Sequence, residues 1–233
     1  VIIVALTVSG VRLLLTTANL YQEEVEQLAS TLLEQPVKIG RMDAKLSGLI
    51  PTIIFHHVDL LSEQKNKSLF SLARIDVGLS LDDLIWQQKV TPQELTIRGL
   101  NLHVTRSVDG SLKIKGLDLD ALKKSEKNES GSILERWLLH QGEIGLEDST
   151  FIWKDEQNAG LTWFFDDVNF LIKSIGGRHQ LLLSSKLPEE FGSKLKMAVD
   201  IAGDLSTPET WDAKVYLESK KINLQPAQTY FKN

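Results

Sequence analysis

The sequence contains no cysteine among its 233 residues. This absence excludes a disulfide framework, a thiol nucleophile and thiolate metal sites. It is compatible with a protein of a reducing compartment and with a cysteine-free protein of an oxidising compartment. Catalytic signatures are missing as well, since the chain has no G-x-S-x-G, no Walker loop and no dinucleotide-binding glycine pattern. We therefore expect no catalytic residues, and a protein that is not an enzyme.

Metal ligands and basic clusters are equally scarce. None of the five histidines forms an H-x-x-x-H pair or stands at ligand spacing from a carboxylate, so we expect no metal and no cofactor. The net charge is −5. The densest basic cluster, Lys123, Lys124 and Lys127, is interleaved with Glu126 and Glu129 and is typical of a solvated linker. Because phosphate binding needs a clustered basic surface, we expect no nucleic-acid partner.

What is present begins with an apolar segment at the N-terminus, which does not start with Met. Residues 1–11 read VIIVALTVSGV and, as a helix, would cover roughly 16 Å, about half of a bilayer's ~30 Å hydrocarbon core. We expect residues 1–15 to be the exit half of a transmembrane anchor. A signal-peptide core or a buried helix are the alternatives, although no small-residue cleavage site follows. A single anchor ahead of the bulk of the chain suits a bacterial periplasmic protein.

Residues 16–36 are predicted to continue as an amphipathic helix. Its apolar stripe follows spacings of four, three and four, and glutamates and glutamines fill the opposite face. Pro36 ends it, because proline has no N–H to donate and favours an extended preceding residue. The stripe is Tyr21, Val25, Leu28 and Leu32, and the polar face is Gln22, Glu23, Glu24, Glu26 and Gln27.

From Val37 onwards apolar and polar residues alternate, the pattern of antiparallel strands with one covered face. The clearest strands lie at residues 73–79, 195–201 and 211–217. Asp109-Gly110 is a strong hairpin signal, because tight turns need a positive φ, and Asn158–Gly160 and Gly176-Gly177 predict two further turns. Short helices are expected at Leu81–Trp86, Asp118–Lys124 and Ser132–His140.

The apolar face changes parity partway along several strands. The changes fall between Phe55 and Val58, Ile97 and Leu100, Leu146 and Phe151, and Phe165 and Val168. Because a one-residue slip sends every later side chain to the other face, each change predicts a β-bulge or a bend. Repeated bends predict a curved sheet.

Two of these segments match at a constant offset of 49 residues. Leu95, Ile97, Leu102 and Val104 correspond to Ile144, Leu146, Phe151 and Trp153. Chance similarity between amphipathic strands is one explanation, and a repeating array of strands is the other.

At this point the chain resembles a known family. The segments "VSGVRLLL", "EQPVKIGRMDAKLSGLIPTIIFHHVDLL", "LFSLARIDVGLSLDDLIWQQKVTPQELTIRGLNLHV" and "GEIGLEDSTFIW" together are similar to the N-terminal end of YhdP-type AsmA-like proteins. That family is related to the translocation-and-assembly-module and chorein-type lipid-transfer proteins. The resemblance covers nearly the whole chain, and its most specific part is the order of helix, Gly48, Pro51, apolar strand and short helix.

The resemblance implies a mainly β fold with an N-terminal α-helix. It implies a curved antiparallel sheet that forms a repeating, taco-shaped β-groove with short helices between its strands. We expect the anchor at 1–15, the amphipathic helix at 16–36, a first β-groove unit at 37–124, a linker at 125–131 and a second, C-terminally truncated unit at 132–233.

The implied function is an inner-membrane-anchored periplasmic bridge that carries phospholipid towards the outer membrane of a Gram-negative bacterium and supports outer-membrane lipid homeostasis and barrier function. Its partners would be phospholipid, the inner membrane at the N-terminal helix, and the outer membrane or its proteins at the far end of a longer chain. The alternative is a periplasmic scaffold that aids outer-membrane protein assembly by strand addition.

The candidate groove lining follows from the apolar stripes of the strands. Each member could equally be ordinary core under a helix. The candidates are Ile75, Val77, Leu79, Leu100, Leu102, Val104, Phe151, Trp153, Val168, Phe170, Met197, Val199, Val215 and Leu217.

Overall fold

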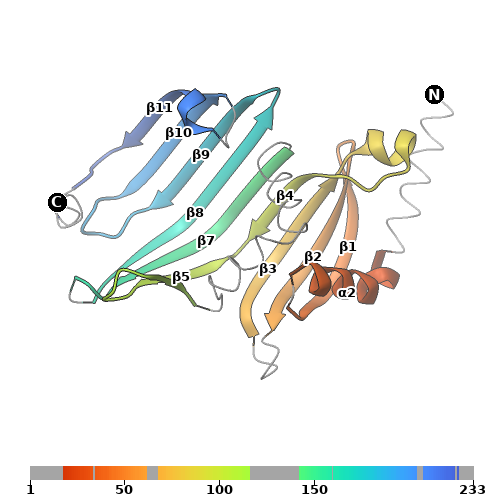
Figure 1. Ribbon diagram of the computed structural model, residues 1–233, viewed down its shortest axis with the longest axis horizontal. Coiled ribbons are helices and arrows are strands. Elements are labelled where there is room, and N and C mark those ends of the chain that lie inside the picture. Colours follow the sequence, from red (N-terminus) through yellow and green to blue (C-terminus); the bar gives the residue numbers. More distant parts are fainter. Residues whose placement is uncertain are drawn as a thin grey trace. The chain divides into compact units, whose positions relative to one another are not determined.

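The computed structural model describes residues 18–33, 35–61, 68–115, 142–158, 160–203, 207–223 and 225. It is mainly β with an N-terminal α-helix, as predicted (Figure 1). The chain divides into two compact units, unit 1 up to Arg98 and unit 2 from Gly99. The expected membrane segment, the linker at 125–131 and the helices at 118–124 and 132–140 lie outside the described residues, and the expected domain bounds stay a prediction. No helix in the described part of the chain is long and apolar enough to cross a membrane.

Unit 1 is a helical segment followed by an antiparallel meander. The elements are the 3-10 helix η1 (Ala18–Tyr21), α2 (Gln22–Leu33), β1 (Val37–Ser47), β2 (Ile50–Leu61), β3 (Ser68–Leu79), the short π-helical turn η2 (Asp83–Gln87) and β4 (Pro92–Arg98). Each strand pairs with the next one in sequence. The helical turn predicted at Leu81–Trp86 is confirmed.

The core of unit 1 lies on and beside β1. Val37, Ile39 and Met42 are only 5%, 6% and 2% exposed. Met42 begins a cross-strand row that continues through Phe55 and Ile75 on the neighbouring strands. Contacts between side chains that lie opposite one another on paired strands stabilise a sheet. The apolar residues of the predicted alternating pattern therefore pack against one another across these strands.

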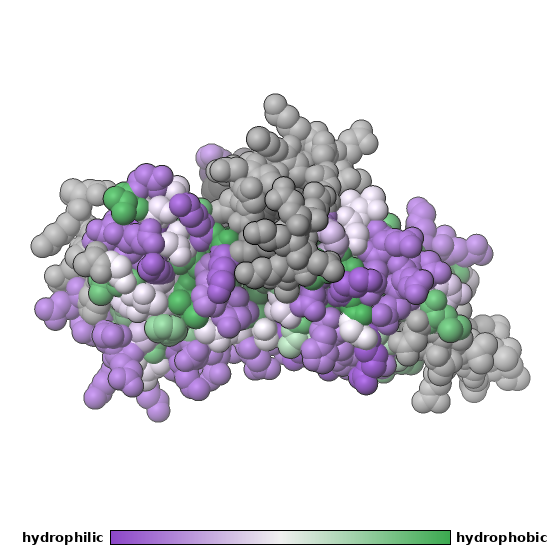
Figure 2. Space-filling view, turned by 90° about the horizontal axis from the view of Figure 1, so that it is seen from below, coloured by the Kyte–Doolittle hydropathy of each residue, from purple (hydrophilic) through white to green (hydrophobic). Residues whose placement is uncertain are grey.

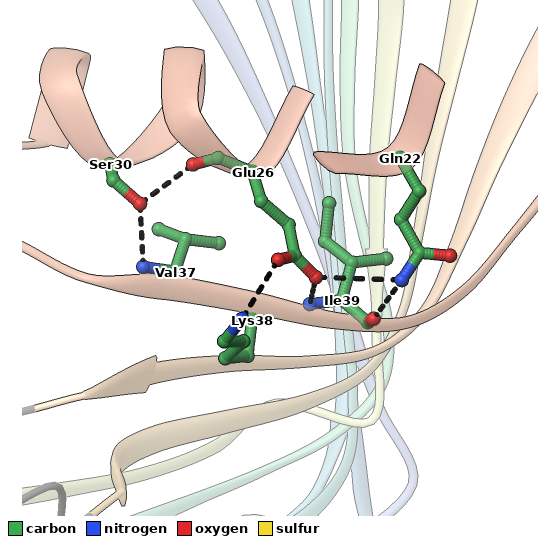
Figure 3. A network of polar contacts seen from close by, with 6 residues as sticks. All are labelled: Gln22, Glu26, Ser30, Val37, Lys38 and Ile39. Atoms are coloured by element: carbon green, nitrogen blue, oxygen red, sulfur yellow. Dashed lines mark hydrogen bonds and ion pairs between the residues drawn. The ribbon is translucent and has the colours of Figure 1, made fainter. Parts of the chain in front are cut away.

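Helix α2 lies against β1 through polar side chains (Figure 3). Gln22 Nε2 donates to the Ile39 carbonyl (2.7 Å), the Ile39 N–H donates to Glu26 Oε1 (2.8 Å), and the Val37 N–H donates to Ser30 Oγ (2.9 Å). Amphipathic helices normally pack through their apolar stripe, yet two residues of this stripe, Tyr21 and Leu28, are 59% and 61% exposed. The physical reason is that edge strands present unpaired N–H and C=O groups, which polar side chains can satisfy.

Unit 2 is an open sheet of strands. Its elements are β5 (Asn101–Arg106), β6 (Leu112–Ile114), β7 (Gly142–Asp155), β8 (Leu161–Ile175), β9 (Arg178–Lys186), β10 (Lys194–Ala202), the 3-10 helix η3 (Pro208–Thr210) and β11 (Asp212–Ser219). Their spatial order is β6-β5-β7-β8-β9-β10-β11, and the strands curve along their length (Figure 1). The three predicted turns join β5 to β6, β7 to β8 and β8 to β9.

One strand pair corrects the expectation of a wholly antiparallel sheet. β5 runs parallel to β7, with Leu102 opposite Phe151 and Val104 opposite Trp153. The two members of each pair are 49 residues apart in the sequence, which is the offset found in the sequence analysis. At these positions the offset therefore arises because β5 and β7 pair in parallel, with matching residues side by side. Like side chains therefore stack beside one another, because parallel strands in register place corresponding residues on the same face.

Every predicted change of parity coincides with a residue of positive φ. The φ angles are 53° at His57, 68° at Gly99, 49° at Asp148 and 47° at Asp167. Strand register shifts around Asp148 and around Asp167, so the bulges predicted there are confirmed. His and Asp are among the few non-glycine types that tolerate this region, because their short polar side chains can bond locally.

Candidate functional site

Unit 2 carries two cross-strand rows of apolar side chains on one face of strands β7 to β11. Strand register places the members of each row directly opposite one another on successive strands. Five strands about 4.8 Å apart make each row about 19 Å long. We call this surface the apolar face of unit 2. Its first row is Leu146, Phe170, Leu183, Met197 and Leu217, and its second is Ile144, Ile172, Leu181, Val199 and Val215.

This face is only partly covered. None of its row members is buried, and at β11 Val215 and Leu217 are 67% and 57% exposed. In the described part of unit 2 the elements are strands and one short 3-10 helix, and no second layer packs on the rows. Aliphatic side chains left this open cost free energy in water unless something apolar covers them.

The opposite face of the same strands, which we call the charged face, carries charged residues on both sides of one apolar row, and that row runs through Leu171, Leu182, Ala198 and Tyr216. Lys173 pairs with Glu143 (3.1 Å) and Arg178 with Asp200 (3.0 Å), each pair bridging neighbouring strands. In the space-filling view, hydrophobic residues form patches flanked by hydrophilic ones (Figure 2). The apolar face therefore presents two adjacent apolar rows, whereas charged residues border the single apolar row of the charged face.

A shallow pocket of about 310 Å³ lies mainly on this charged face. Leu182, Ala198 and Tyr216 line it, and Lys196 and Glu218 border it. Leu183 and Met197 also line it, but strand alternation places their side chains on the other face. The pocket lining runs from Leu171 on β8 to Tyr216 on β11. We place the candidate site on the rows because they hold two parallel lines of apolar side chains over five strands.

The two bulges are held together by one side chain. The Asp148 N–H donates to Asn169 Oδ1 (3.1 Å), and Asn169 Nδ2 donates to the Asp167 carbonyl (2.7 Å). Lys186 forms an ion pair with Asp167, and its hydrogen bond and charge lower the pKa of that carboxyl below its ordinary value. The bulges on β7 and β8 thus bend both strands at the same level and keep apolar residues on one face on either side of the bend.

Beyond the bend, the apolar lining becomes aromatic. Phe151 contacts Phe165 with ring centroids 5.6 Å apart, and Trp163 meets Phe191 edge to face at 4.8 Å. Trp153 is directly opposite Trp163 in the strand pair. Offset and edge-to-face rings are the favoured arrangements, so ring contacts stabilise this end of the unit.

A buried ion pair anchors the aromatic end. Asp155 is fully buried, and its carboxylate accepts from Arg106 Nε (3.0 Å) and Arg106 Nη2, from the Gln157 N–H (3.0 Å) and from Asn158 Nδ2 (2.8 Å). These bonds join β5, β7 and the turn after β7. The parallel strand is therefore held by a satisfied charge as well as by backbone pairing.

The predicted lining residues occupy different environments. Phe170, Met197, Val199, Val215 and Leu217 lie in the two rows. Val168 lies beside the bulge, opposite Ser149. Leu102, Phe151 and Trp153 are partly exposed members of the aromatic end, and Leu100 precedes β5. Val104 is 7% exposed there. In unit 1, Ile75 and Val77 are partly exposed on β3, and Leu79 is 7% exposed.

Half of the row residues were missed by the sequence analysis. Ile144, Leu146 and Ile172 showed the right parity but were not selected. Leu181 and Leu183 flank Leu182 in an uninterrupted leucine run, and alternation cannot identify a face in such a run. The pairing of Leu183 with Met197 and of Leu181 with Val199 is the signal that places them.

The described residues hold no group of three or more His, Asp or Glu side chains placed to share a metal ion. The chain matches none of the curated proteins with which it was compared. The sequence model of the YhdP protein family, in contrast, matches residues 1–233. Together with the helix, the open curved sheets and the apolar face, this match shows that the chain belongs to the YhdP family.

Proposed function

We propose that this chain is part of an inner-membrane-anchored periplasmic bridge that carries phospholipid along an apolar β-groove towards the outer membrane. In this role it contributes to outer-membrane lipid homeostasis and barrier function. The observation that carries the proposal is the apolar face of unit 2, whose rows end in the exposed Val215 and Leu217. Membership of the YhdP family supports it.

The dimensions of the face suit an acyl chain. Each row is about 19 Å long, whereas one leaflet of a bilayer with a ~30 Å hydrocarbon core holds chains about 15 Å long. Each CH₂ group removed from water contributes about 0.8 kcal/mol. A tail lying along a row therefore avoids much of the cost of crossing water, while the headgroup remains hydrated. The proposal assigns the chain no chemical reaction.

The test compares two neighbouring residues of β11 that lie on opposite faces. Val215→Glu places a charge at the end of the second row, and Tyr216→Glu places the same charge on the other face, where the wild-type side chain is 60% exposed. The full chain and both variants are purified from a bacterial host under mild conditions and examined by native mass spectrometry and lipid extraction.

We expect co-purifying phospholipid with the wild type and with Tyr216→Glu, and its loss with Val215→Glu. The physical reason is that a carboxylate in contact with an acyl chain is desolvated without a partner. Circular dichroism checks that both variants keep their strands. Lipid-free wild-type protein, or equal lipid loss in both variants, would contradict the proposal.

A scaffold for outer-membrane protein assembly is the second candidate. It would add extended polypeptide to a free sheet edge. The side chains of β11 from Asp212 to Glu218 are exposed, which favours this edge over β1, where α2 side chains occupy the backbone groups. Saturable binding of an unfolded outer-membrane protein segment by lipid-free chain would favour this function.

A further inference from the structure

The two ends of the unit 1 meander differ sharply in character. An antiparallel meander places the β1–β2 turn and the β3–β4 connection at one end, and the last residue of β2 and the first residue of β3 at the other (Figure 1). The β2–β3 connection, residues 62–67, reads SEQKNK and is wholly polar in sequence. At the opposite end four large apolar residues are exposed. We call this the apolar end of unit 1: Leu49 at 70%, Ile85 at 36%, Trp86 at 81% and Val90 at 68%.

Turn geometry does not require Leu49. Gly48 and Leu49 form the two-residue turn closed by the Ser47–Ile50 pair, and Gly48 supplies the positive φ of 62°. A glycine in the first of two turn positions satisfies this type of hairpin, and the second position usually holds a polar residue. The leucine at the tip therefore contributes an apolar surface for which the fold of the hairpin has no need.

The connection that carries Trp86 is internally bonded. The Ser80 N–H donates to the Thr91 carbonyl (2.9 Å) and closes its base, and the Leu84 N–H donates to the Ser80 carbonyl (3.1 Å). Gln87 Nε2 donates to Asp83 Oδ1 (2.7 Å). A loop built in this way holds its outward side chain in a defined position, because its own polar groups are already satisfied.

We propose that the apolar end of unit 1 inserts into the interfacial region of the membrane beside the N-terminal segment. This inference rests on the proposed inner-membrane anchoring. Protein surfaces that lie at the level of the lipid headgroups typically combine tryptophan, aliphatic residues and lysine. At that depth the amphipathic indole ring contacts both lipid and water, and a lysine side chain, here that of Lys89, can extend to water.

The lipid surface is the occupant that the rest of unit 1 favours. The sequence ahead of Ala18 contains the apolar run VIIVALTVSGV, so this unit is the part of the chain that such a segment would tether beside a bilayer. The acidic Asp82 and Asp83 lie close in sequence to Lys89, so the end has no net positive charge to direct it to nucleic acid or to an acidic protein. Three strand spacings separate β1 from β4, about 14 Å, so the two connections that carry these four side chains lie close together at one end of the sheet.

Because the sequence lacks cysteine, single labels can test this insertion in the full chain. Leu49→Cys, Trp86→Cys and Val90→Cys are each labelled with a nitrobenzoxadiazole dye and bound to vesicles of phosphatidylethanolamine and phosphatidylglycerol. The matched control is Ser71→Cys, an exposed position near the start of β3 and thus near the polar end of the same unit. Doxyl-labelled phosphatidylcholine quenches from the lipid side and iodide from the water side.

We expect lipid-side quenching and protection from iodide at the three test positions, and the reverse at Ser71→Cys. Full iodide access at all four positions would overturn the inference, and protection from iodide without lipid-side quenching would instead indicate a protein partner or a second copy. Phospholipid co-purification is measured on the same variants, whose side chains lie outside the two rows. Failure of membrane insertion can therefore be told apart from failure of the lipid-carrying function.

Discussion

At the scale of single residues, unit 2 depends on a buried charge. Asp155 has no exposed surface, and its four hydrogen bonds connect Arg106 with the turn that follows β7. A buried carboxylate is tolerated because each of its oxygens accepts bonds from charged or amide donors. Removing it would leave the guanidinium of Arg106, which is only 23% exposed, without this partner.

We predict that Asp155→Ala lowers the free energy of unfolding by about 3–5 kcal/mol, the cost of breaking a buried pair. The neighbouring change Glu156→Ala is the control, because the Glu156 pair with Lys154 is 37% and 50% exposed. Its cost should stay below about 1 kcal/mol. Urea unfolding of both variants gives the two free energies of unfolding. Similar decreases in the two variants would contradict the claim that the burial of Asp155 makes its ion pair the more stabilising one.

Backbone strain at the residue scale explains where the sheet bends. Asp148 and Asp167 adopt positive φ inside long strands, and the sequence signalled both positions through parity alone. The side chain of Asn169 bonds to the backbone of both residues, an arrangement that no periodicity reveals. The bend was therefore predictable, whereas the contact that stabilises it required the strands to be paired.

At the scale of elements, α2 protects the edge of β1. Gln22, Glu26 and Ser30 are four residues apart and lie on one side of the helix, facing the outward N–H and C=O groups of Val37 and Ile39 (Figure 3). The helix thus satisfies edge N–H and C=O groups that a further strand would otherwise pair with. This arrangement disfavours strand addition at β1.

The charge state of Glu26 should control this protection. Burial raises the pKa of its carboxyl, but hydrogen bonds from the Ile39 N–H, Lys38 and Gln22, together with the charge of Lys38, lower it by more. The net effect holds the pKa of the Glu26 carboxyl below its ordinary value. A depressed carboxyl pKa contributes stability above the unfolded-state pKa, and this contribution is lost as the pH falls through the folded-state pKa.

We predict that Glu26→Gln destabilises the protein by about 1–3 kcal/mol at pH 7, since a charge-assisted hydrogen bond is weakened. The difference from the wild type should begin to shrink as the pH falls below the unfolded-state pKa of about 4.3, and it should be lost as the pH falls through the lower folded-state pKa of Glu26. Thermal unfolding at several pH values measures both effects. The exposed Glu23→Gln serves as control, and a pH-independent difference would contradict the assigned role of Glu26.

At the scale of the whole molecule, function depends on which strand face meets the lipid. Leu182 and Leu183 are adjacent in β9, yet Leu183 belongs to the first row and Leu182, at 49% exposure, lies on the charged face. We predict that p-benzoylphenylalanine at position 183 cross-links phospholipid on illumination and that the same group at position 182 does so weakly. Equal cross-linking at the two positions would contradict the proposal that phospholipid binds on the apolar face of unit 2 and not on the opposite face.

Much of the secondary structure and part of the candidate site could be read from the sequence. Val199 and Val215 were selected by their alternation, and the structure places them opposite each other in one row. Leu181 was not identified, because it begins a run of three leucines. Periodicity measures the character of a face only where polar residues interrupt the apolar ones.

The sequence by itself determined the strands, the turns and the bends, because alternation, glycine placement and parity are local properties of the chain. Only the tertiary structure decided that β5 runs parallel to β7, and that α2 meets β1 through its polar side chains. Both depend on groups distant in sequence, namely the ladder that pairs Arg106 with Asp155 and the free edge that Glu26 satisfies. Such pairings are selected by the free energy of the assembled unit, which no short window of residues contains.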